Sequence, residues 1–247
     1  MAILLREKLK SINNFFFDLL FPSFCLNCQR EGNYICEDCF SLINISTNQY
    51  CPFCRPPKIV LDGKTCYACA KTAKLAGLFC AASYQHFIIK KIISQFKYEP
   101  FIKELAKPLA FLIIQHFKLL DHPLPFSKDR SGFFLIPVPL HKKRLKWRGF
   151  NQAEEIASEL SAFLKIPLIS NVLLKTKETK PQVELTAENR KENIKEVFIC
   201  QNQDSIKNKK ILLVDDVFTT GATMEECASL LRQAGAKEVW GIAAARE

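Results

Sequence analysis

The feature of the sequence that most constrains its fold is a set of eight cysteines near the amino terminus. They form four Cys-x-x-Cys pairs, which are Cys25/Cys28, Cys36/Cys39, Cys51/Cys54 and Cys66/Cys69. Such a turn directs two thiolates at one centre, and two turns together complete a tetrahedral site for Zn²⁺. The segment that holds these pairs is too short to build a sufficient apolar core, so bound metal would supply its folding free energy. We therefore expect a double zinc ribbon over residues 25–72, with two structural zinc sites.

The order of these pairs favours one zinc on the first two pairs and a second zinc on the last two. A cross-braced pairing is an alternative that the spacing does not exclude. An iron–sulfur cluster is a weaker reading, because the two-ribbon spacing favours zinc. A redox role is weaker still, since no βαβ pattern surrounds the pairs. The remaining cysteines, Cys80, Cys200 and Cys227, stand in apolar settings typical of buried small side chains.

The first 24 residues predict an amphipathic helix that ends before Pro22. Charged residues such as Glu7 interrupt any signal-peptide core, and no small-residue cleavage site follows. No apolar run approaches the roughly 20 residues needed to cross a bilayer. We expect a cytoplasmic protein without a transmembrane segment, with a peripheral position at the inner face of the membrane as the alternative.

The chain is basic, with a formal net charge of +10. A charge of this size suggests anionic partners such as phosphates or nucleic acid, and a solvated lysine-rich surface is the competing explanation. From about residue 75 onward, apolar strand-like and helix-like segments alternate. Strands are expected near 77–86, 133–139, 197–201, 209–217 and 238–247, and helices near 87–98, 101–119, 151–164 and 223–236. This alternation predicts an α/β domain over residues 75–247 with a mainly parallel sheet and flanking helices.

Two adjacent acids follow one of these buried strands. Ile211–Val214 reads as the strand, Asp215 and Asp216 come next, and a Thr-Thr-Gly-Ala-Thr run leads into a helix. In parallel α/β sheets this loop lies at the carboxyl end, where ligands bind. Small residues at a helix start form a cradle for one phosphate, while carboxylates accept hydrogen bonds from a diol or help to hold Mg²⁺. Phosphate, diol and metal together describe a ribose 5-phosphate, whereas a capped, solvent-exposed turn is the plain alternative.

The segment ILLVDDVFTTGAT resembles the phosphoribosyl pyrophosphate (PRPP) signature of type I phosphoribosyltransferases. The whole chain is similar to a narrower group, the competence protein F (ComF) family, in the motifs DLLFPSFC, FKYEP, IPVPLHKKRLKWRGFNQ and ETKPQVELTAENRKENIKEVF. The resemblance implies that a type I phosphoribosyltransferase-like domain follows a small zinc-ribbon domain. It also implies that the acids bind the ribose hydroxyls and the loop binds the 5-phosphate. The implied PRPP residues are Asp215, Asp216, Thr219, Thr220, Gly221, Ala222 and Thr223.

A basic segment follows the strand at 133–139, at the same end of the sheet. The candidate residues are Lys142, Lys143, Arg144, Lys146, Arg148, Asn151 and Gln152. In the resemblance they would serve a pyrophosphate loop or a mobile hood, and the same charges suit a nucleic-acid backbone, with Trp147 and Phe150 able to stack on bases. A solvated basic loop is the plain alternative. A second basic segment, Lys175, Lys177, Lys180, Arg190 and Lys191 with polar Gln182 and Asn193, predicts a flexible lobe. Lys175 and Lys177 stand where the family pattern leads us to expect arginines, which make stronger bidentate contacts.

Three functions follow from the resemblance. The first is a PRPP-binding protein that handles incoming single-stranded DNA during DNA uptake and natural transformation, with a helicase-like ATPase as the implied partner. The second is an active phosphoribosyltransferase that uses PRPP and Mg²⁺ with an unknown acceptor. The third is a regulator that senses PRPP without turnover. We favour the first, and the sequence leaves catalysis and the acceptor open.

Overall fold

The computed structural model describes residues 22–127, 129–177 and 197–247. The chain divides into two compact units, one ending at Ile43 and the other comprising Asn44–Glu247. The first holds helix α2 (Glu37–Ser41), while the second holds the other cysteine group together with the sheet. The predicted helix over residues 1–24 lies almost wholly outside the described residues, as do Lys180, Gln182, Arg190, Lys191 and Asn193. The predicted domain boundaries stay predictions.

The centre of the larger unit is a four-stranded sheet in the order β3-β8-β7-β4, with every neighbouring pair parallel. Its strands are β3 (Gly77–Ser83), β4 (Phe133–Pro137), β7 (Lys210–Phe218) and β8 (Glu238–Arg246). The prediction of an α/β fold with a mainly parallel sheet is therefore confirmed. Because both central strands are buried on both faces, they read as nearly continuous apolar runs in the sequence.

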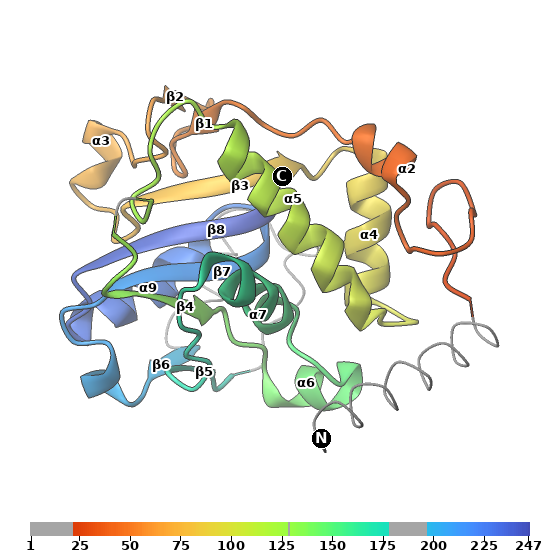
Figure 1. Cartoon of the computed structure of the whole chain (residues 1–247). Helices are drawn as coiled ribbons and strands as arrows, with labels where there is room; N and C mark the ends of the chain where they lie inside the picture. Colours follow the sequence, from red (N-terminus) through yellow and green to blue (C-terminus); the bar gives the residue numbers. More distant parts are fainter. Residues whose placement is uncertain (1–21, 128, 178–196) are drawn as a thin grey trace, which may run out of the picture. The chain divides into compact units, whose positions relative to one another are not determined.

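Helices cover both faces of the sheet (Figure 1). One face carries α4 (Phe87–Lys97), α5 (Ala106–Leu119) and α7 (Gln152–Leu164), and the other carries α9 (Ala222–Gln233). Successive strand residues point to opposite faces, so Ile211 and Leu213 join the core beneath α9 while Leu212 and Val214 face the other layer. The acids that follow continue this alternation.

Smaller elements complete the unit. Strands β1 (Gln49–Tyr50) and β2 (Ile59–Val60) form an antiparallel ribbon, and α3 (Tyr67–Ala70) follows it. Strands β5 (Leu173–Lys175) and β6 (Phe198–Cys200) form a second antiparallel pair outside the main sheet. The sequence predicted the strand at β6 but not its partner, because β5 is only three residues long.

The basic segment that follows β4 forms a helix that the sequence did not predict. This helix, α6 (Lys142–Arg148), ends at Gly149 with φ +85°. The side chain of His141 accepts a hydrogen bond from the Lys143 N–H at the start of this helix. This cap and the left-handed glycine explain why so charged a segment is helical.

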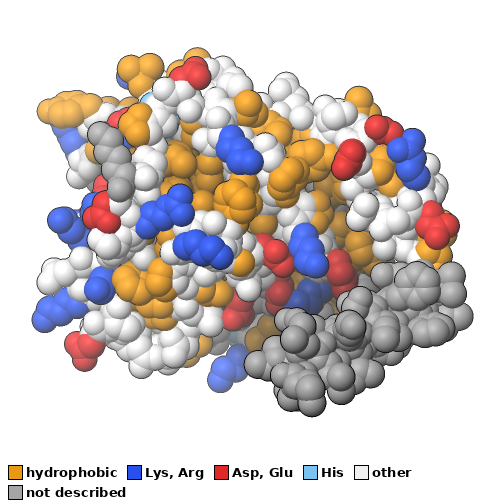
Figure 2. All heavy atoms as spheres, in the orientation of Figure 1, with side chains coloured by type: hydrophobic (Ala, Val, Ile, Leu, Met, Phe, Trp, Pro, Cys, Tyr) orange, Lys and Arg blue, Asp and Glu red, His pale blue; other side chains and the backbone are white. Residues whose placement is uncertain are grey.

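On the face shown in Figure 2, charge is not gathered into one patch, and Lys and Arg side chains lie between acidic and apolar ones. In the part of the chain that the structure describes, no helix is long and apolar enough to cross a membrane.

Candidate functional site

The acid pair lies where one edge of strand β7 becomes open. Pairing with β4 stops at Pro137 opposite Val214, whereas pairing with β8 continues to Phe218 opposite Arg246. The strand therefore runs through both acids, in agreement with the expected range 209–217 and beyond the shorter segment Ile211–Val214, because β8 keeps pairing beyond that point. Asp215 and Asp216 remain beyond the carboxyl end of β4, at the edge of the sheet where α/β folds bind ligands.

Asp216 is buried and bound to a lysine that the sequence analysis did not single out. Its carboxylate Oδ1 lies 2.8 Å from Nζ of Lys97, the last residue of α4. Burial opposes the charge on Lys97, but the carboxylates of Asp216 and Asp215 outweigh it and raise the lysine's pKa. The only sequence signal for this contact was the position of Lys97 within the family-like motif FKYEP. The pair keeps Asp216 oriented before any ligand arrives.

Asp215 occupies the opposite face of the strand, toward α9. Burial is the main cause that raises its pKa to about 7, and the charge of Asp216 raises it further, while Lys97 lowers it. Its Oδ1 accepts a hydrogen bond from the Asp216 backbone N–H at 2.9 Å. Asp215 is consequently a carboxyl group whose ionisation falls near neutral pH, which is common where acids serve a function.

The loop after the strand, Thr219–Gly221, connects directly to α9. Gly221 has φ +82°, and a Cβ at this position would lie 2.6 Å from Cζ of Phe218, so only glycine fits. Among the described residues, the N–H groups of Thr220 and Gly221 donate no hydrogen bond. They lie at a helix start together with threonine hydroxyls, an arrangement suited to an anion. That this loop binds a phosphate stays a prediction.

Helix α6 divides its cations between two faces. Arg144 and Arg148 are one turn apart and share the inner face. Arg148 donates a hydrogen bond to Oε1 of Gln152, and its Nε is buried without a partner in the described chain. Burial lowers the pKa of Arg148, while the nearby Asp216 charge raises it. The inner face thus brings guanidinium groups toward the acid pair.

The outer face of α6 carries Lys142, Lys143 and Lys146, which are exposed. Trp147 is 57% exposed and makes an edge contact with Phe101, with ring centroids 4.7 Å apart. Phe150, in contrast, is buried and packs against Phe96 at 5.4 Å. Of the two aromatic residues expected to stack on bases, only Trp147 is accessible. Phe150 instead packs in the core, just before the start of α7.

Asn151 and Gln152 hold this region together. Asn151 accepts from the Ala153 N–H as the cap of α7 and donates to the Val138 carbonyl at 3.1 Å. Gln152 is buried and donates to the Phe96 carbonyl at 3.0 Å while accepting from Arg148. Both residues position their neighbours, and their contact with a ligand stays a prediction.

Lys175 in β5 approaches the site from the α9 side. Its ammonium group lies 5.5 Å from the Phe198 ring centre. Burial lowers its pKa, and the nearby charge of Arg144 lowers it further. Lys175 of β5 therefore lies near both Arg144 of α6 and Asp215. The sequence did not reveal this proximity, because these residues are far apart in the chain. Its neighbour Lys177 is exposed.

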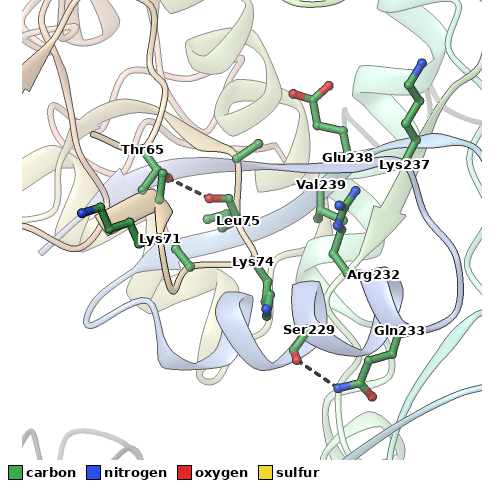
Figure 3. Close-up of a pocket in the computed structure, with 13 residues that line it drawn as sticks. Thr65, Lys71, Lys74, Leu75, Ser229, Arg232, Gln233, Lys237, Glu238 and Val239 are labelled. Atoms are coloured by element: carbon green, nitrogen blue, oxygen red, sulfur yellow. Dashed lines mark hydrogen bonds between the residues drawn. The ribbon is translucent and has the colours of Figure 1, made fainter. Parts of the chain in front are cut away.

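A basic pocket lined by other residues is shown in Figure 3. Its volume is about 720 Å³, and it lies between the segment following the second cysteine group and the carboxyl-terminal half of α9. Lys71, Lys74, Arg232 and Lys237 supply its cations, and Glu238 is its acid. It contains none of the residues predicted for PRPP, so it offers a second location where an anion could bind and a useful control.

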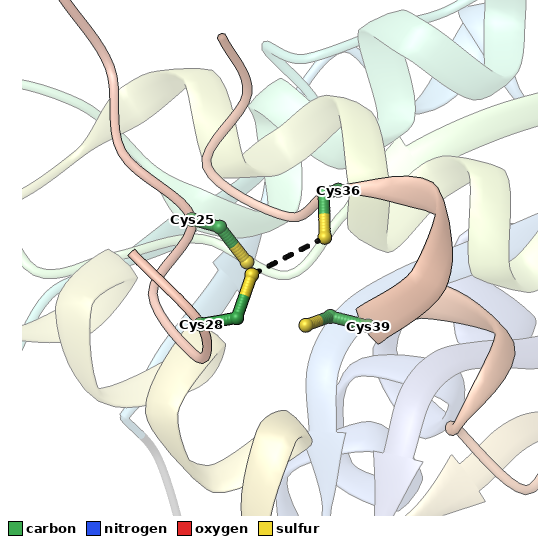
Figure 4. Close-up of side chains that lie close together, drawn as sticks. All are labelled: Cys25, Cys28, Cys36 and Cys39. Atoms are coloured by element: carbon green, nitrogen blue, oxygen red, sulfur yellow. Dashed lines mark hydrogen bonds between the residues drawn. The ribbon is translucent and has the colours of Figure 1, made fainter. Parts of the chain in front are cut away.

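The eight paired cysteines gather into two groups of four. Figure 4 shows the side chains of Cys25, Cys28, Cys36 and Cys39 pointing to one centre. In each group, the second made by Cys51, Cys54, Cys66 and Cys69, all sulfur atoms lie within 4.8 Å of one another. Sulfur–sulfur distances of 3.5 Å (Cys28–Cys36 and Cys54–Cys66) are close to the roughly 3.8 Å edge of a tetrahedral zinc–thiolate site and far too long for a disulfide. The groups follow the sequential pairing that the sequence favoured.

The thiol chemistry also fits a metal. A hydrogen bond from the Cys69 backbone lowers the pKa of Cys66 to about 6. Burial, followed by the neighbouring Cys66 and Cys54 thiols, raises the pKa of Cys69 to about 12. Four thiolates cannot share so small a volume without a cation, and a divalent metal removes this repulsion. Both groups are therefore suited to a metal ion.

Comparison with known proteins agrees with this architecture. A family model described as phosphoribosyl transferase domain matches residues 146–245. The chain is 29% identical to competence protein F of Haemophilus influenzae, over 86% of this chain and 98% of that protein. It is 29% identical to competence protein ComFC of Bacillus subtilis, over 83% of this chain and 81% of that protein. It is 28% identical to the DNA utilization protein YhgH of Escherichia coli O157:H7, over 77% of this chain and 94% of that protein.

Solved structures align with this chain less well than the sequence relatives do. The purine phosphoribosyltransferase of Pyrococcus horikoshii is 16% identical and covers 56% of this chain and 80% of its own, with a TM-score of 0.30. A score this low carries no weight for function. The sequence matches and the two cysteine groups together make the chain similar to the competence protein F family, with a region that matches the phosphoribosyl transferase domain and two potential metal sites.

Proposed function

We propose that this protein binds PRPP together with Mg²⁺ and uses the same domain in handling single-stranded DNA during DNA uptake. Asp215 and Asp216 would accept hydrogen bonds from the ribose hydroxyls, and the Thr219–Thr223 loop would bind the 5-phosphate. The observation that carries this proposal is the position of the acid pair at an open strand edge, immediately before an amide-lined loop. The similarity to phosphoribosyl transferase domains supports it.

The cations around the acids support a pyrophosphate group in the same place. Lys97 already neutralises Asp216, whereas Arg144 and Lys175 are placed near Arg148 and Asp215. The unpartnered Nε of Arg148 provides a buried donor that an anion could satisfy. Binding PRPP with Mg²⁺ would add negative and positive charge together, so the site would remain close to electrically balanced.

We propose zinc as the metal in both cysteine groups, because four thiolates at tetrahedral distances suit this ion. The metal would hold each group of loops in place. No reaction step is assigned to it.

Titration of PRPP with Mg²⁺ into the wild type and into Asp215→Asn/Asp216→Asn tests the ligand. Two lost charge-assisted acceptors should weaken binding by roughly 100-fold or more. A matched control, Lys74→Ala/Lys237→Ala, removes two cations from the basic pocket of Figure 3 and should retain wild-type affinity. Wild-type affinity in the Asp variant would refute the site, and release of pyrophosphate with an added acceptor would report turnover separately.

The outer face of α6 is the proposed contact for DNA, because exposed lysines and an exposed tryptophan combine backbone attraction with base stacking. Binding of a fluorescent single-stranded oligonucleotide should weaken with salt. The variant Lys142→Ala/Lys143→Ala/Lys146→Ala should lower the slope of log affinity against log salt by about 2. Lys71→Ala/Lys74→Ala/Lys237→Ala removes the same charge elsewhere and should leave the slope near that of the wild type; equal losses in both variants would contradict a local site.

A further inference from the structure

The second cysteine group touches the proposed phosphate loop. Arg55 follows Cys54 directly, and its Nη2 donates a hydrogen bond to the carbonyl oxygen of Thr219 at 3.1 Å. The ring of Phe53 approaches Gly221, with Cε1 lying 3.4 Å from the place that a Cβ would occupy. A turn that would bind metal therefore lies against the loop that would bind phosphate, although 164 positions separate Arg55 from Thr219 in the sequence.

Further contacts attach this turn to the end of the sheet. Nη2 of Arg246, at the end of β8, donates to the carbonyls of Cys51 and Pro52 at 3.3 and 3.4 Å. The same guanidinium lies 5.6 Å from the ring centre of Phe218, which immediately precedes the loop. The position of the metal-binding turn is thus defined relative to the loop from two sides.

A third connection involves helix α9. The carboxylate of Glu225 accepts hydrogen bonds from the backbone N–H groups of Lys74 and Leu75, at 2.6 and 3.1 Å. These residues follow Cys69, the last cysteine of the group, and Glu225 lies in the first turn of α9. The chain that follows the second cysteine group is therefore tied to the helix that begins at the loop.

Positive charge accumulates at this contact. Burial lowers the pKa of Arg246, and the nearby charge of Arg55 lowers it further. In the part of the chain that the structure describes, neither arginine forms an ion pair with a carboxylate. The Thr219 bond is the single hydrogen bond recorded for the Arg55 side chain there, which leaves the other N–H donors of its planar fork for an anion.

We propose that Arg55 is a further residue of the anion site formed by Thr219–Thr223, so that metal on the second cysteine group and a phosphate ester on the loop bind cooperatively. The proposal rests on the PRPP site proposed above. The metal fixes Cys54 and with it the adjacent guanidinium, and the anion then adds a charge-assisted hydrogen bond to that guanidinium. Thermodynamic linkage requires the effect to be reciprocal, so the anion must also tighten the metal.

The test measures removal of zinc from the purified protein by a chromogenic chelator, with and without PRPP and Mg²⁺. In the wild type, the ligand should lower the extraction of one of the two zinc equivalents at least about fivefold. Arg55→Ala should weaken PRPP binding roughly tenfold and abolish this protection, while Arg55→Lys should restore part of both effects. Lys58→Ala removes an exposed cation from the same ribbon and should behave as the wild type.

If Arg55→Ala retains both wild-type affinity and ligand protection of zinc, the role of Arg55 is refuted while PRPP binding stands. If the wild type and Lys58→Ala fail to bind PRPP, both proposals fall. If Arg55→Ala loses zinc before any ligand is added, the Arg55→Lys variant provides the decisive comparison. Ligand protection of zinc in Arg55→Lys, in part or in full, supports the role, and no protection at normal zinc content refutes a role for the charge.

Discussion

At the scale of single residues, the acid pair is asymmetric. Asp216 is buried and neutralised by Lys97, whereas the neighbouring Asp215 has a pKa raised to about 7 by burial and by Asp216. Nothing in the sequence distinguishes these two adjacent aspartates. Period-two alternation along the strand separates them, so that each acid has its own face, its own partners and its own chemistry.

This asymmetry predicts the pH dependence of ligand binding. Below pH 7 the Asp215 carboxyl takes up a proton and loses an acceptor for a ribose hydroxyl, so PRPP affinity should fall by up to about tenfold per pH unit. Lys97→Met removes a charge that lowers the pKa of Asp215, which should move the midpoint of this loss to higher pH. Titration calorimetry between about pH 6 and about pH 9 measures both effects. Lys90→Met, on the exposed face of the same helix, is the control; an unchanged midpoint in Lys97→Met would contradict the coupling.

At the scale of elements, the loop between β7 and α9 depends on one glycine. Gly221→Ala would place a Cβ 2.6 Å from the Phe218 ring in a left-handed conformation, so the loop must shift. We expect a loss of about 1–3 kcal/mol in unfolding free energy and a clear loss of PRPP affinity, measured by denaturant titration and calorimetry.

The matched control for this change is Gly235→Ala at the other end of α9. Gly235 also has a positive φ, +94°, but a Cβ there would approach no atom closer than 3.4 Å. This variant should lose some stability while keeping its affinity for PRPP. Equal losses of affinity in both variants would mean that helix stability, and not the loop, controls binding.

The elements also show what sequence reasoning could reach. Long apolar strands such as β7 and regular helices such as α7 carry strong periodic signals, so the parallel sheet and the acid-pair loop were predictable. Helix α6 was not predicted, because its stability comes from a histidine cap and a terminal glycine and not from an apolar face. Contacts such as Lys97–Asp216 and Arg55–Thr219 join residues far apart in the chain, and no local pattern records them.

At the scale of the whole molecule, the two cysteine groups belong to different compact units. The second group is built into the larger unit through backbone bonds, since the Thr65 N–H donates to the Ala76 carbonyl and the Leu78 N–H to the Gly63 carbonyl. A metal at this group would consequently stabilise the edge of the sheet itself. The first group offers the same ligand chemistry in a separate unit.

Removing the ligands of one metal at a time should expose this difference. Cys51→Ser/Cys54→Ser should lose one zinc equivalent and lower the unfolding temperature of the larger unit, because the loops that carry Arg55 and meet Arg246 would no longer be fixed. Cys25→Ser/Cys28→Ser should lose the other equivalent and leave that transition within a few degrees of the wild type. Metal analysis and calorimetric scanning measure the two effects. A fall of the main transition by the same amount in both variants would show that the second group has no special part in the sheet, and that its contact with the phosphate loop has no consequence for stability.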